Sequence, residues 1–591
     1  MTPSSPEHSS RLTRRSLLAA SAAATAIGAQ AIRGAHAQSD AFVTAIGTSH
    51  QFATEAGAEV LSEGGTAADA AVAAAAVLSV VEPYFSHVLG GGVWGLYFEA
   101  ATGEVTALDG VGPAGSLISL DAYAPHAESR GMHQANVPGA WDGWMLWLER
   151  YGRISLPRLL EPAIDLARGG FPASAELAIF IGFVEESVRN HPPTAELYVI
   201  DDKLVEATQT LFNEDLAVTL EGISSAFTGA AIGALNRGRP ESEARAAGIK
   251  AARDQVYRGP IAEAIVNDSN EWGGWLTRDD FASFEAEIVP AISVPYGETS
   301  RVYQCPPNSQ GATMLLALNI LKGMDFSGLT PHHPDVVHAQ IEAIKLANGD
   351  RHAFIADPAF TDIDLDWLLS DDHAAEQLAR IDMDQAMAWP KNAATTTAGG
   401  NTTTIQISDR YGNAATVTTS LGFQFRVITG TGIHINERMR FYSLDPENPN
   451  VVAPGKRVRH TSCPYMVLRD GVPWAVGGNT GVDTQPQVQL QQMMAAIDFG
   501  HSPQDSINLA RWVSTAFPAS IAPNEVENTL QLEDEFPASV ISELEDRGHN
   551  VDVGNGIFGS GGMIKFSEDR TLAQVGVDRR FSTSLGMIVP G

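Results

Sequence analysis

The residues best suited to chemistry in this chain lie around Thr402. The sequence 399–407 reads Gly-Gly-Asn-Thr-Thr-Thr-Ile-Gln-Ile. Its second half and the segment that follows predict a β-hairpin with strands Thr404–Ser408 and Asn413–Thr419, because a Tyr-Gly-Asn turn separates two alternating runs. A run made of Ala, Thr and Gly at 392–400 leads into the hairpin.

Cleavage between Asn401 and Thr402 would give Thr402 a free α-amine beside its own hydroxyl. The hydroxyl can then act as a nucleophile, and the amine can serve as its general base. This is the chemistry of enzymes that process themselves to expose an N-terminal nucleophile. Taken alone, the stretch also fits a Thr/Gly-rich linker ahead of an ordinary hairpin. The rest of the chain favours the catalytic interpretation.

The first 37 residues have the features of an export signal. Arg14-Arg15 precede an Ala-rich apolar stretch, which ends at Ala35-His36-Ala37. A twin arginine, a short apolar region and a small-x-small cleavage site are typical of a Tat signal peptide. A disordered or membrane-anchored tail is the alternative, but the apolar run is too short to span a bilayer. We expect a periplasmic or secreted protein that begins near Gln38, with a large subunit 38–401 and a small subunit 402–591.

The charge balance excludes several classes of partner. The chain has 38 Lys and Arg against 70 Asp and Glu, for a net charge of -32, and removal of the signal makes this about -35. Such a surface repels nucleic acid and anionic membranes. After the signal, no stretch reads as long and apolar enough for a transmembrane helix.

The cysteines and histidines do not form the patterns of a disulfide framework or a metal site. Cys305 and Cys463 are the two cysteines, and Cys463 fits a packing role better than a nucleophile. His332-His333 have no partner at ligand spacing, so we expect neither a metal nor a cofactor.

Helices and strands mix along the mature chain without a linker or a tandem repeat. Residues 170–290 look largely helical and surface-facing, with no identifiable chemistry. Further helices are predicted at 64–81, 137–167, 312–321, 336–350 and 487–498, and further strands at 93–99, 105–109, 433–436, 466–468, 474–477, 563–566 and 572–577. The triple glycine 90–92 lacks the Lys-Ser/Thr of a phosphate loop and indicates close backbone packing. Helix layers on both sides of sheets are the simplest architecture.

Taken together, these residues resemble the γ-glutamyltransferase family of N-terminal nucleophile hydrolases, and the resemblance covers nearly all of the mature chain. The matching segments are Gly64–Gly92, Val137–Gly139, Pro306–Gly311, Lys345–Ala347, Asp350-Arg351, Thr402-Thr403, Gly412-Asn413, Gly430–Ile433 and Pro454–Arg457. The resemblance implies an α+β fold, a four-layer αββα sandwich, and cleavage between Asn401 and Thr402. The two subunits would share one core as a heterodimer.

The same resemblance assigns the catalytic residues. Thr402 matches the nucleophile; Thr403 and Thr404 are rival positions, but the spacing to Gly412-Asn413 favours Thr402. Ser420 falls where the family has a second hydroxyl, with a solvent-facing serine as the alternative. Gly481 and Val482 match the backbone donors of an oxyanion hole, although Val482 replaces a glycine.

The chain departs from the family where glutamyl substrates are bound. The expected arginine is absent from Leu108–Pro113, an expected Asn is Gly422, the acidic residue that would hold the substrate amine is Phe441, and paired serines become His460-Thr461. The lid segment, Leu444–Val452, also looks short.

The stretches from Leu444-Asp445-Pro446 to His460-Thr461 and from Asp483 to Gln487 look more like a different branch of the family, which has oxamate amidohydrolase-like and cephalosporin acylase-like members. We therefore expect a small-molecule amide substrate with a non-glutamyl acyl group. Arg438, Arg440, His460 and Thr461 are the candidate binding residues, with arginines on a solvated face as the alternative for the first two. A true γ-glutamyl transferase with a rebuilt pocket, and a non-catalytic exported binding protein, remain the other two readings.

Overall fold

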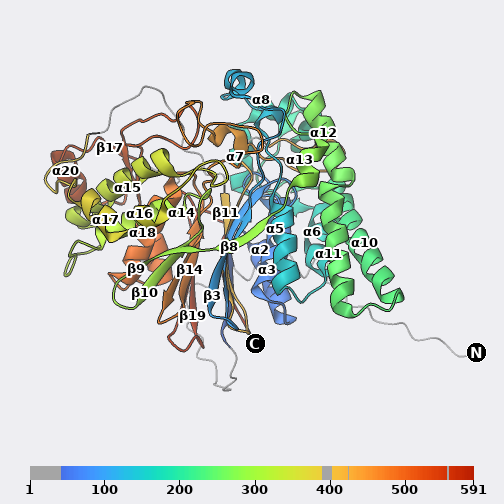
Figure 1. Ribbon diagram of the computed structural model, residues 1–591, viewed down its shortest axis with the longest axis horizontal. Coiled ribbons are helices and arrows are strands. Elements are labelled where there is room, and N and C mark those ends of the chain that lie inside the picture. Colours follow the sequence, from blue (N-terminus) through green and yellow to red (C-terminus); the bar gives the residue numbers. More distant parts are fainter. Residues whose placement is uncertain (1–41, 389–401, 423–424, 555–557, 591) are drawn as a thin grey trace, which may run out of the picture. The chain divides into compact units, whose positions relative to one another are not determined.

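Two antiparallel sheets lie face to face between two layers of helices (Figure 1). The computed structural model describes residues 42–388, 402–422, 425–554 and 558–590. The predicted signal peptide, the run 392–400 and Asn401 therefore lie outside the described residues. Strands β11 and β12 contact β14, and β1 contacts β18 and β19, so the two sheets pack on each other.

Both sheets draw strands from either side of the predicted cleavage site. In the first sheet the order is β20 (Leu585–Val589), β1 (Thr44–Thr48), β11 (Thr402–Ser408), β12 (Ala414–Ser420), β2 (Gly92–Glu99), β3 (Glu104–Gly110) and β8 (Glu287–Pro290). In the second it is β19 (Ala573–Val577), β18 (Gly561–Phe566), β14 (Val472–Asn479), β13 (Tyr465–Arg469), β10 (Ser300–Gln304) and β9 (Ile292–Tyr296). Separating the two subunits would expose both sheets, which explains how they can share one core.

Helices cover the outer face of each sheet. Over the first sheet and beyond it lie α2 (Gln51–Ser62), α3 (Ala67–Val81), α5 (Ala140–Tyr151), α6 (Leu156–Gly169), α10 (Glu214–Asn236), α11 (Glu241–Tyr257) and α12 (Pro260–Glu271). Over the second lie α14 (Gly311–Leu321), α15 (Pro334–Phe354), α17 (Asp371–Leu378), α18 (Thr484–Ile497), α19 (Pro503–Asn508) and α20 (Ala538–Asp546).

Shorter elements complete the described chain. They are α4 (Leu120–Tyr123), α7 (Ala175–Gly182), α8 (Glu185–Arg189), α9 (Pro192–Tyr198), α13 (Arg278–Ser283), α16 (Leu365–Leu368), the 3-10 turns η1 (Ala124–His126), η2 (Met132–Gln134) and η3 (Arg438–Phe441), and the strands β4 (Phe171–Pro172), β5 (Val199–Ile200), β6 (Lys203–Leu204), β7 (Thr210–Leu211), β15 (Trp512–Ser514), β16 (Leu530–Leu532) and β17 (Val551–Val553).

Helix α3 shows how the sequence builds the first helical layer. Thr66 and Asp69 form a reciprocal capping box at its start, and every residue of the helix is buried. Ala side chains dominate it, so α2 and the strands β11 and β12 approach its backbone closely. Glu82 ends the helix as expected, and its buried carboxylate faces β11.

Most of the expected elements are present, but the strand expected at 433–436 is wrong. This stretch forms only an isolated bridge between Val427 and His434. Gly430 and Gly432, with φ of 68° and 67°, turn the chain just before it. The Asn436 backbone N–H then donates to the Gly90 carbonyl at 3.1 Å, so the stretch pairs with a loop instead of a sheet.

Helix α10 corrects the expectation about apolar stretches. By length and composition alone it could cross a membrane, although only 28% of its most apolar window is buried. It packs on α6 and α11 in the helical layer. Core helices of soluble proteins can have the same length and composition, so these two properties are weak evidence for a membrane-spanning helix.

The triple glycine is confirmed as a site of close backbone approach. A Cβ on Gly90 would overlap the carbonyl oxygen of His434. Replacement of Gly90 by Ala should therefore lower the free energy of unfolding by about 1–3 kcal/mol, because a backbone atom cannot move away as a side chain can. Urea unfolding followed by circular dichroism measures this.

The matched control is Gly222→Ala in α10, where a Cβ meets no atom within 4 Å. This change should raise stability by up to about 1 kcal/mol, because alanine favours a helix more than glycine does. Equal stability of the Gly90→Ala variant and the wild type would contradict the close approach.

Candidate active site

Alternation along β11 places Thr402 between the two sheets. A Cβ built on Gly478 of β14 would lie 2.6 Å from the Thr404 hydroxyl, so Thr404 faces the second sheet. Thr402 is two residues earlier and shares that face. Thr403 points the other way, into the helical layer, where its hydroxyl donates to the Glu82 carboxylate at 3.2 Å.

The hydroxyls of the three threonines have different surroundings. Thr402 stands opposite Ser420 in the register of β11 and β12, and their hydroxyl oxygens are 3.2 Å apart. The Gln485 side-chain amide also donates to Thr402 Oγ1, at 3.4 Å. Thr404 instead donates to the Val417 carbonyl at 3.0 Å. Of the three, Thr402 is the one whose hydroxyl meets Ser420, the predicted second hydroxyl of the site.

A strained turn lies just before α18. Gly481 has φ of 118° and Val482 has φ of 51°, both in the left-handed region. Within the described part of the chain, neither backbone N–H donates to an acceptor. Gln485, which contacts Thr402, lies in the first turn of α18. Its backbone N–H donates to the Val482 carbonyl at 3.4 Å. Two free N–H groups on a turn tied to the nucleophile suit an oxyanion hole.

Buried polar side chains hold this turn in place. Gln310 donates its amide to the carbonyls of Val482, at 2.9 Å, and Thr461, at 2.7 Å. Arg351 forms an ion pair with Asp483 and donates to the Gln310 side chain at 3.1 Å. The turn is thus held at the Val482 carbonyl and at the Asp483 side chain, next to the two N–H groups.

Arg438 is a buried cation next to the second hydroxyl. Its Nη2 donates to the Ser420 hydroxyl, and its guanidinium lies 4.6 Å from the centre of the Phe441 ring. Its Nε and Nη1 are buried and have no acceptor in the described part of the chain. Burial lowers the pKa of Arg438 to about 10, against the opposing charge of Glu437, so the group stays charged at neutral pH.

His460 adds a second donor close to Arg438. Its Nδ1 accepts the Ser462 backbone N–H at 3.2 Å, which leaves the proton on Nε2. Burial, and then the charge of Arg438, lower the pKa of His460 well below its usual range, so the ring is neutral. Nε2 has no acceptor among the described residues and lies 3.2 Å from a Cβ built on Gly92, the neighbour of Ser420 in the sheet.

A family model and several known proteins match this chain. The model described as gamma-glutamyltranspeptidase matches residues 53–586. The chain belongs to the γ-glutamyltranspeptidase family. It is 34% identical over 540 residues to the "glutathione hydrolase-like YwrD proenzyme" of Bacillus subtilis, which covers 90% of this chain and 96% of that protein.

Two further relatives lie in other parts of the family. The oxamate amidohydrolase proenzyme of Klebsiella pneumoniae is 28% identical over 515 residues, covering 85% of this chain and 90% of that one. The crystal structure of the cephalosporin acylase from Bacillus halodurans superposes with a TM-score of 0.80 and 28% identity, covering 95% and 99% of the two chains. The predicted αββα fold of the N-terminal nucleophile hydrolases is thereby confirmed.

The structure explains why this member of the family lacks the Asn expected at 422. Gly422 has φ of 110°, and a Cβ there would overlap the Glu437 side chain. Glu437 is buried and forms ion pairs with Arg130, at 3.3 Å, and Arg440, at 3.5 Å. A side chain at 422 and the buried Glu437 therefore exclude each other.

The predicted site residues divide into two groups. Thr402, Ser420 and Arg438 form one chain of hydrogen bonds, and His460 lies beside it. Arg440 is paired with Glu437 and is partly exposed, and the Thr461 hydroxyl is buried without a partner in the described chain. Asn401 lies outside the described residues.

Sequence reasoning missed the residues that support the site. Gln485, Gln310, Arg351 and Asp483 all contribute through contacts between distant parts of the chain. All four stand in segments that carried the resemblance, Gln310 and Arg351 to the family and Asp483 and Gln485 to its acylase-like branch, which was the available signal.

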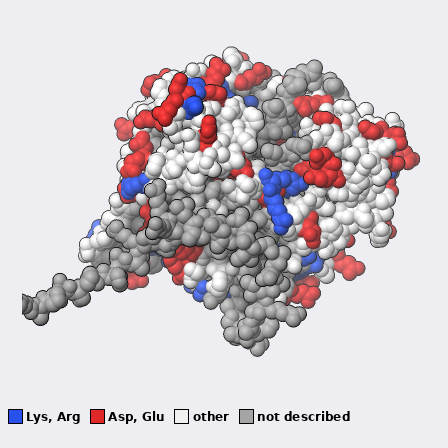
Figure 2. All heavy atoms as spheres, turned by 180° about the vertical axis from the view of Figure 1, so that it is seen from behind, with Lys and Arg blue, Asp and Glu red and all other residues white. Residues whose placement is uncertain are grey.

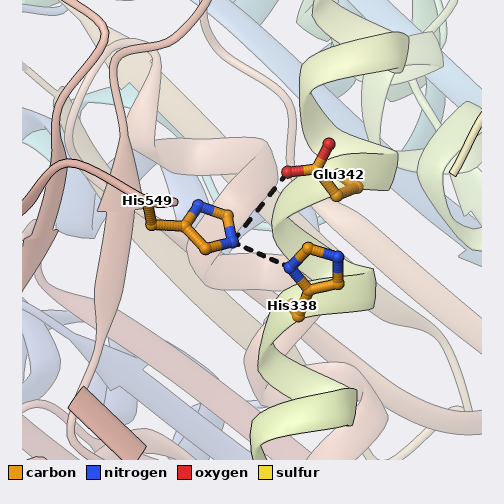
Figure 3. A group of neighbouring side chains, drawn as sticks. All are labelled: His338, Glu342 and His549. Carbon is orange, nitrogen blue, oxygen red and sulfur yellow. Dashed lines mark hydrogen bonds and ion pairs between the residues drawn. The ribbon is translucent and has the colours of Figure 1, made fainter. Parts of the chain in front are cut away.

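A separate group of ligand-type side chains lies on α15 and after α20 (Figure 3). His338 Nδ1 is 2.8 Å from His549 Nε2, which is 4.0 Å from a Glu342 oxygen. The Lys345 ammonium already neutralises Glu342 at 2.7 Å. Burial and the charges of Lys345, His338 and Arg547 lower the pKa of His549 to about 2. These cations disfavour a divalent metal, so we interpret the group as a hydrogen-bonded network.

The buried acid behind the nucleophile strand should affect stability. Ser49 and Thr403 both donate to the Glu82 carboxylate, yet burial raises the pKa of Glu82 to about 7. Between the ordinary value and pH 7, the folded state keeps a proton that the unfolded state has released. The free energy of unfolding should therefore fall as the pH rises through this window, by about 3 kcal/mol at most.

Glu82→Gln keeps the acceptor and removes the titration, so its stability should change less between pH 5 and pH 8. Urea unfolding at both pH values measures the difference. The control Glu263→Gln changes an exposed glutamate of α12 and should behave as the wild type does. Equal pH dependence in the Glu82→Gln variant and the wild type would show that Glu82 does not titrate in this range.

Proposed function

We propose that the protein is an autoprocessed amidohydrolase that transfers the acyl group of an amide to Thr402 and then to water. The acyl group carries a negative charge near its carbonyl. The observation that supports this is Arg438, a buried cation next to Ser420 whose Nε and Nη1 nitrogens lack an acceptor among the described residues. An unpaired buried charge is costly, and a substrate carboxylate would compensate it.

The geometry supports the following reaction. Thr402 Oγ1 attacks the amide carbonyl, and the α-amine freed by cleavage takes the hydroxyl proton. The N–H groups of Gly481 and Val482 stabilise the oxyanion. The α-amine then returns the proton to the leaving amine, and an ester remains on Thr402. Water hydrolyses the ester, with Ser420 holding the Thr402 hydroxyl in position.

A hollow next to the turn at Gly481 and Val482 could hold the leaving amine. A hollow of about 650 Å³, counting space open to solvent, borders Val482 and is lined also by Val513, Phe517 and Ile521. We propose that it receives the amine part of the substrate. Its mainly apolar wall suits an amine with an apolar or aromatic body.

Self-cleavage is the first property to test. The wild-type protein should give two fragments by intact mass spectrometry, the smaller one beginning at Thr402, because only a chain end supplies the α-amine base. Thr402→Ala should stay whole. The controls Thr403→Ala and Thr404→Ala should still be cut, since their hydroxyls are engaged elsewhere. A wild-type chain that stays whole and binds ligand without turnover would favour a binding protein.

The charge of the acyl group can be tested with matched anilides. The wild type should hydrolyse a succinyl anilide faster than a butyryl anilide, and both faster than a γ-glutamyl anilide. Arg438→Gln should lower kcat/KM for the succinyl anilide about 10- to 100-fold, the worth of a charged hydrogen bond, and leave the butyryl anilide nearly unchanged. Arg440→Gln should have the smaller effect, because Arg440 is paired with Glu437.

A dedicated γ-glutamyl enzyme would reverse this order of substrates. Dipeptide acceptors would then accelerate release of the acyl group, which separates transfer from hydrolysis.

The subunit boundaries and the export route also belong to this proposal. The twin arginine and the small-x-small site support removal of residues 1–37 and transport by the Tat pathway to the periplasm. The mature protein would then be a heterodimer of 38–401 and 402–591.

A further inference from the structure

A second hollow is lined by elements that carried no recognisable chemistry in the sequence. Its walls come from α8, from the residues before and after it, from α12's C-terminal end and from the chain between β12 and η3. The lining residues are Arg130, Phe183, Val184, Glu186, Ser187, Asn190, His191, Trp272 and Arg426. Its volume, counting space open to solvent, is about 920 Å³.

Arg426 is the most informative of these residues. Its guanidinium lies 4.8 Å from the centre of the Trp272 ring, and the His191 ring meets the same indole edge-on at 5.2 Å. Its Nε and Nη2 are buried and have no hydrogen-bond partner in the described chain. Among the described carboxylates, none lies within ion-pair distance of it, although Asp268 and Glu271 favour its charge from farther away.

The neighbouring carboxylates have other partners. Asp268 accepts the Thr429 backbone N–H at 3.1 Å. Glu437 is shared by Arg130, the second arginine of the hollow, and Arg440. The lining of the hollow therefore holds one carboxylate, Glu186, and two arginines. Cations are scarce on this protein, and Figure 2 shows acidic side chains scattered over one face while basic ones form a few small groups.

We propose that this hollow binds an organic carboxylate with a flat apolar part. The carboxylate would accept from the Arg426 Nε and Nη2 groups, whose spacing suits the two oxygens of one carboxylate. The flat part would lie against Trp272. The Arg426 carbonyl accepts the Ile435 N–H at 3.0 Å, so the hollow shares its chain segment with Glu437 and Arg438 of the active site.

Two sources of such a carboxylate are possible, and kinetics separates them. If it is the far end of the amide substrate, benzoate should compete and raise KM without changing kcat. If it is a separate molecule, benzoate should bind without raising KM. In both cases benzoate must bind to the hollow directly.

The test is a benzoate titration of the cleaved wild-type enzyme, followed by tryptophan fluorescence. Benzoate should change the emission, and neutral benzamide should not. Arg426→Gln should raise the Kd at least tenfold, and Trp272→Phe should remove the signal. Arg189→Gln on α8, an exposed arginine paired with Glu185 and Asp202 outside the lining, should bind as the wild type does.

Arg438→Gln separates this hollow from the acyl site, since it should leave the fluorescence titration unchanged. Circular dichroism melting shows whether each variant folds, and Arg426→Lys should retain part of the affinity. Equal affinity of the wild type and the Arg426→Gln variant for benzoate would overturn the proposal. So would a signal that persists in Trp272→Phe and disappears in Arg438→Gln.

Discussion

The pairing of β11 with β12 is the constraint on which the site depends. It sets Thr402 opposite Ser420 at the end of both strands, and the period of two along β11 turns Thr402 toward the second sheet and Thr403 toward α3. A slip by one residue would turn Thr402, the proposed nucleophile, toward the helices. The register is held on the outer sides as well, by β1 and by β2, so strands from both subunits define the position of one hydroxyl.

A buried, incompletely paired cation is the second constraint. Arg438 donates a hydrogen bond to Ser420 and contacts the Phe441 ring, yet these contacts do not satisfy a guanidinium with five N–H groups. An unsatisfied buried charge destabilises the folded state unless a bound anion compensates it. On the proposed function, the unsatisfied N–H groups of Arg438 lower stability but place a charge in position before the substrate binds. This is consistent with a rigid acyl pocket that selects by charge.

Local patterns in the sequence predicted most of the helices and strands but not the contacts between them. The catalytic hairpin and α3 follow from alternation, from Gly-Asn at the turn and from the Thr66 cap, all of which act over a few residues. The nucleophile and Ser420 came from the family resemblance together with spacing. The contacts that support the turn at Val482 could not be predicted in this way, because Gln310 lies 172 positions from Val482 in the sequence. Pattern also failed at 433–436, where apolar alternation was followed but Asn436 bonds to a loop backbone.

Val482 brings these arguments together. A β-branched residue in the left-handed region costs about 1–2 kcal/mol, and a glycine would not. Position 481, in contrast, requires glycine, because a Cβ there would overlap the Thr484 hydroxyl. The strain at 482 persists because Gln310 holds its carbonyl and Arg351 holds Asp483 next to it. What the valine contributes is a wall of the hollow beside the oxyanion turn. In the proposed reaction, the same residue would present its backbone N–H to the reacting carbonyl and its side chain to the leaving amine, which would couple the choice of amide to the stabilisation of the oxyanion.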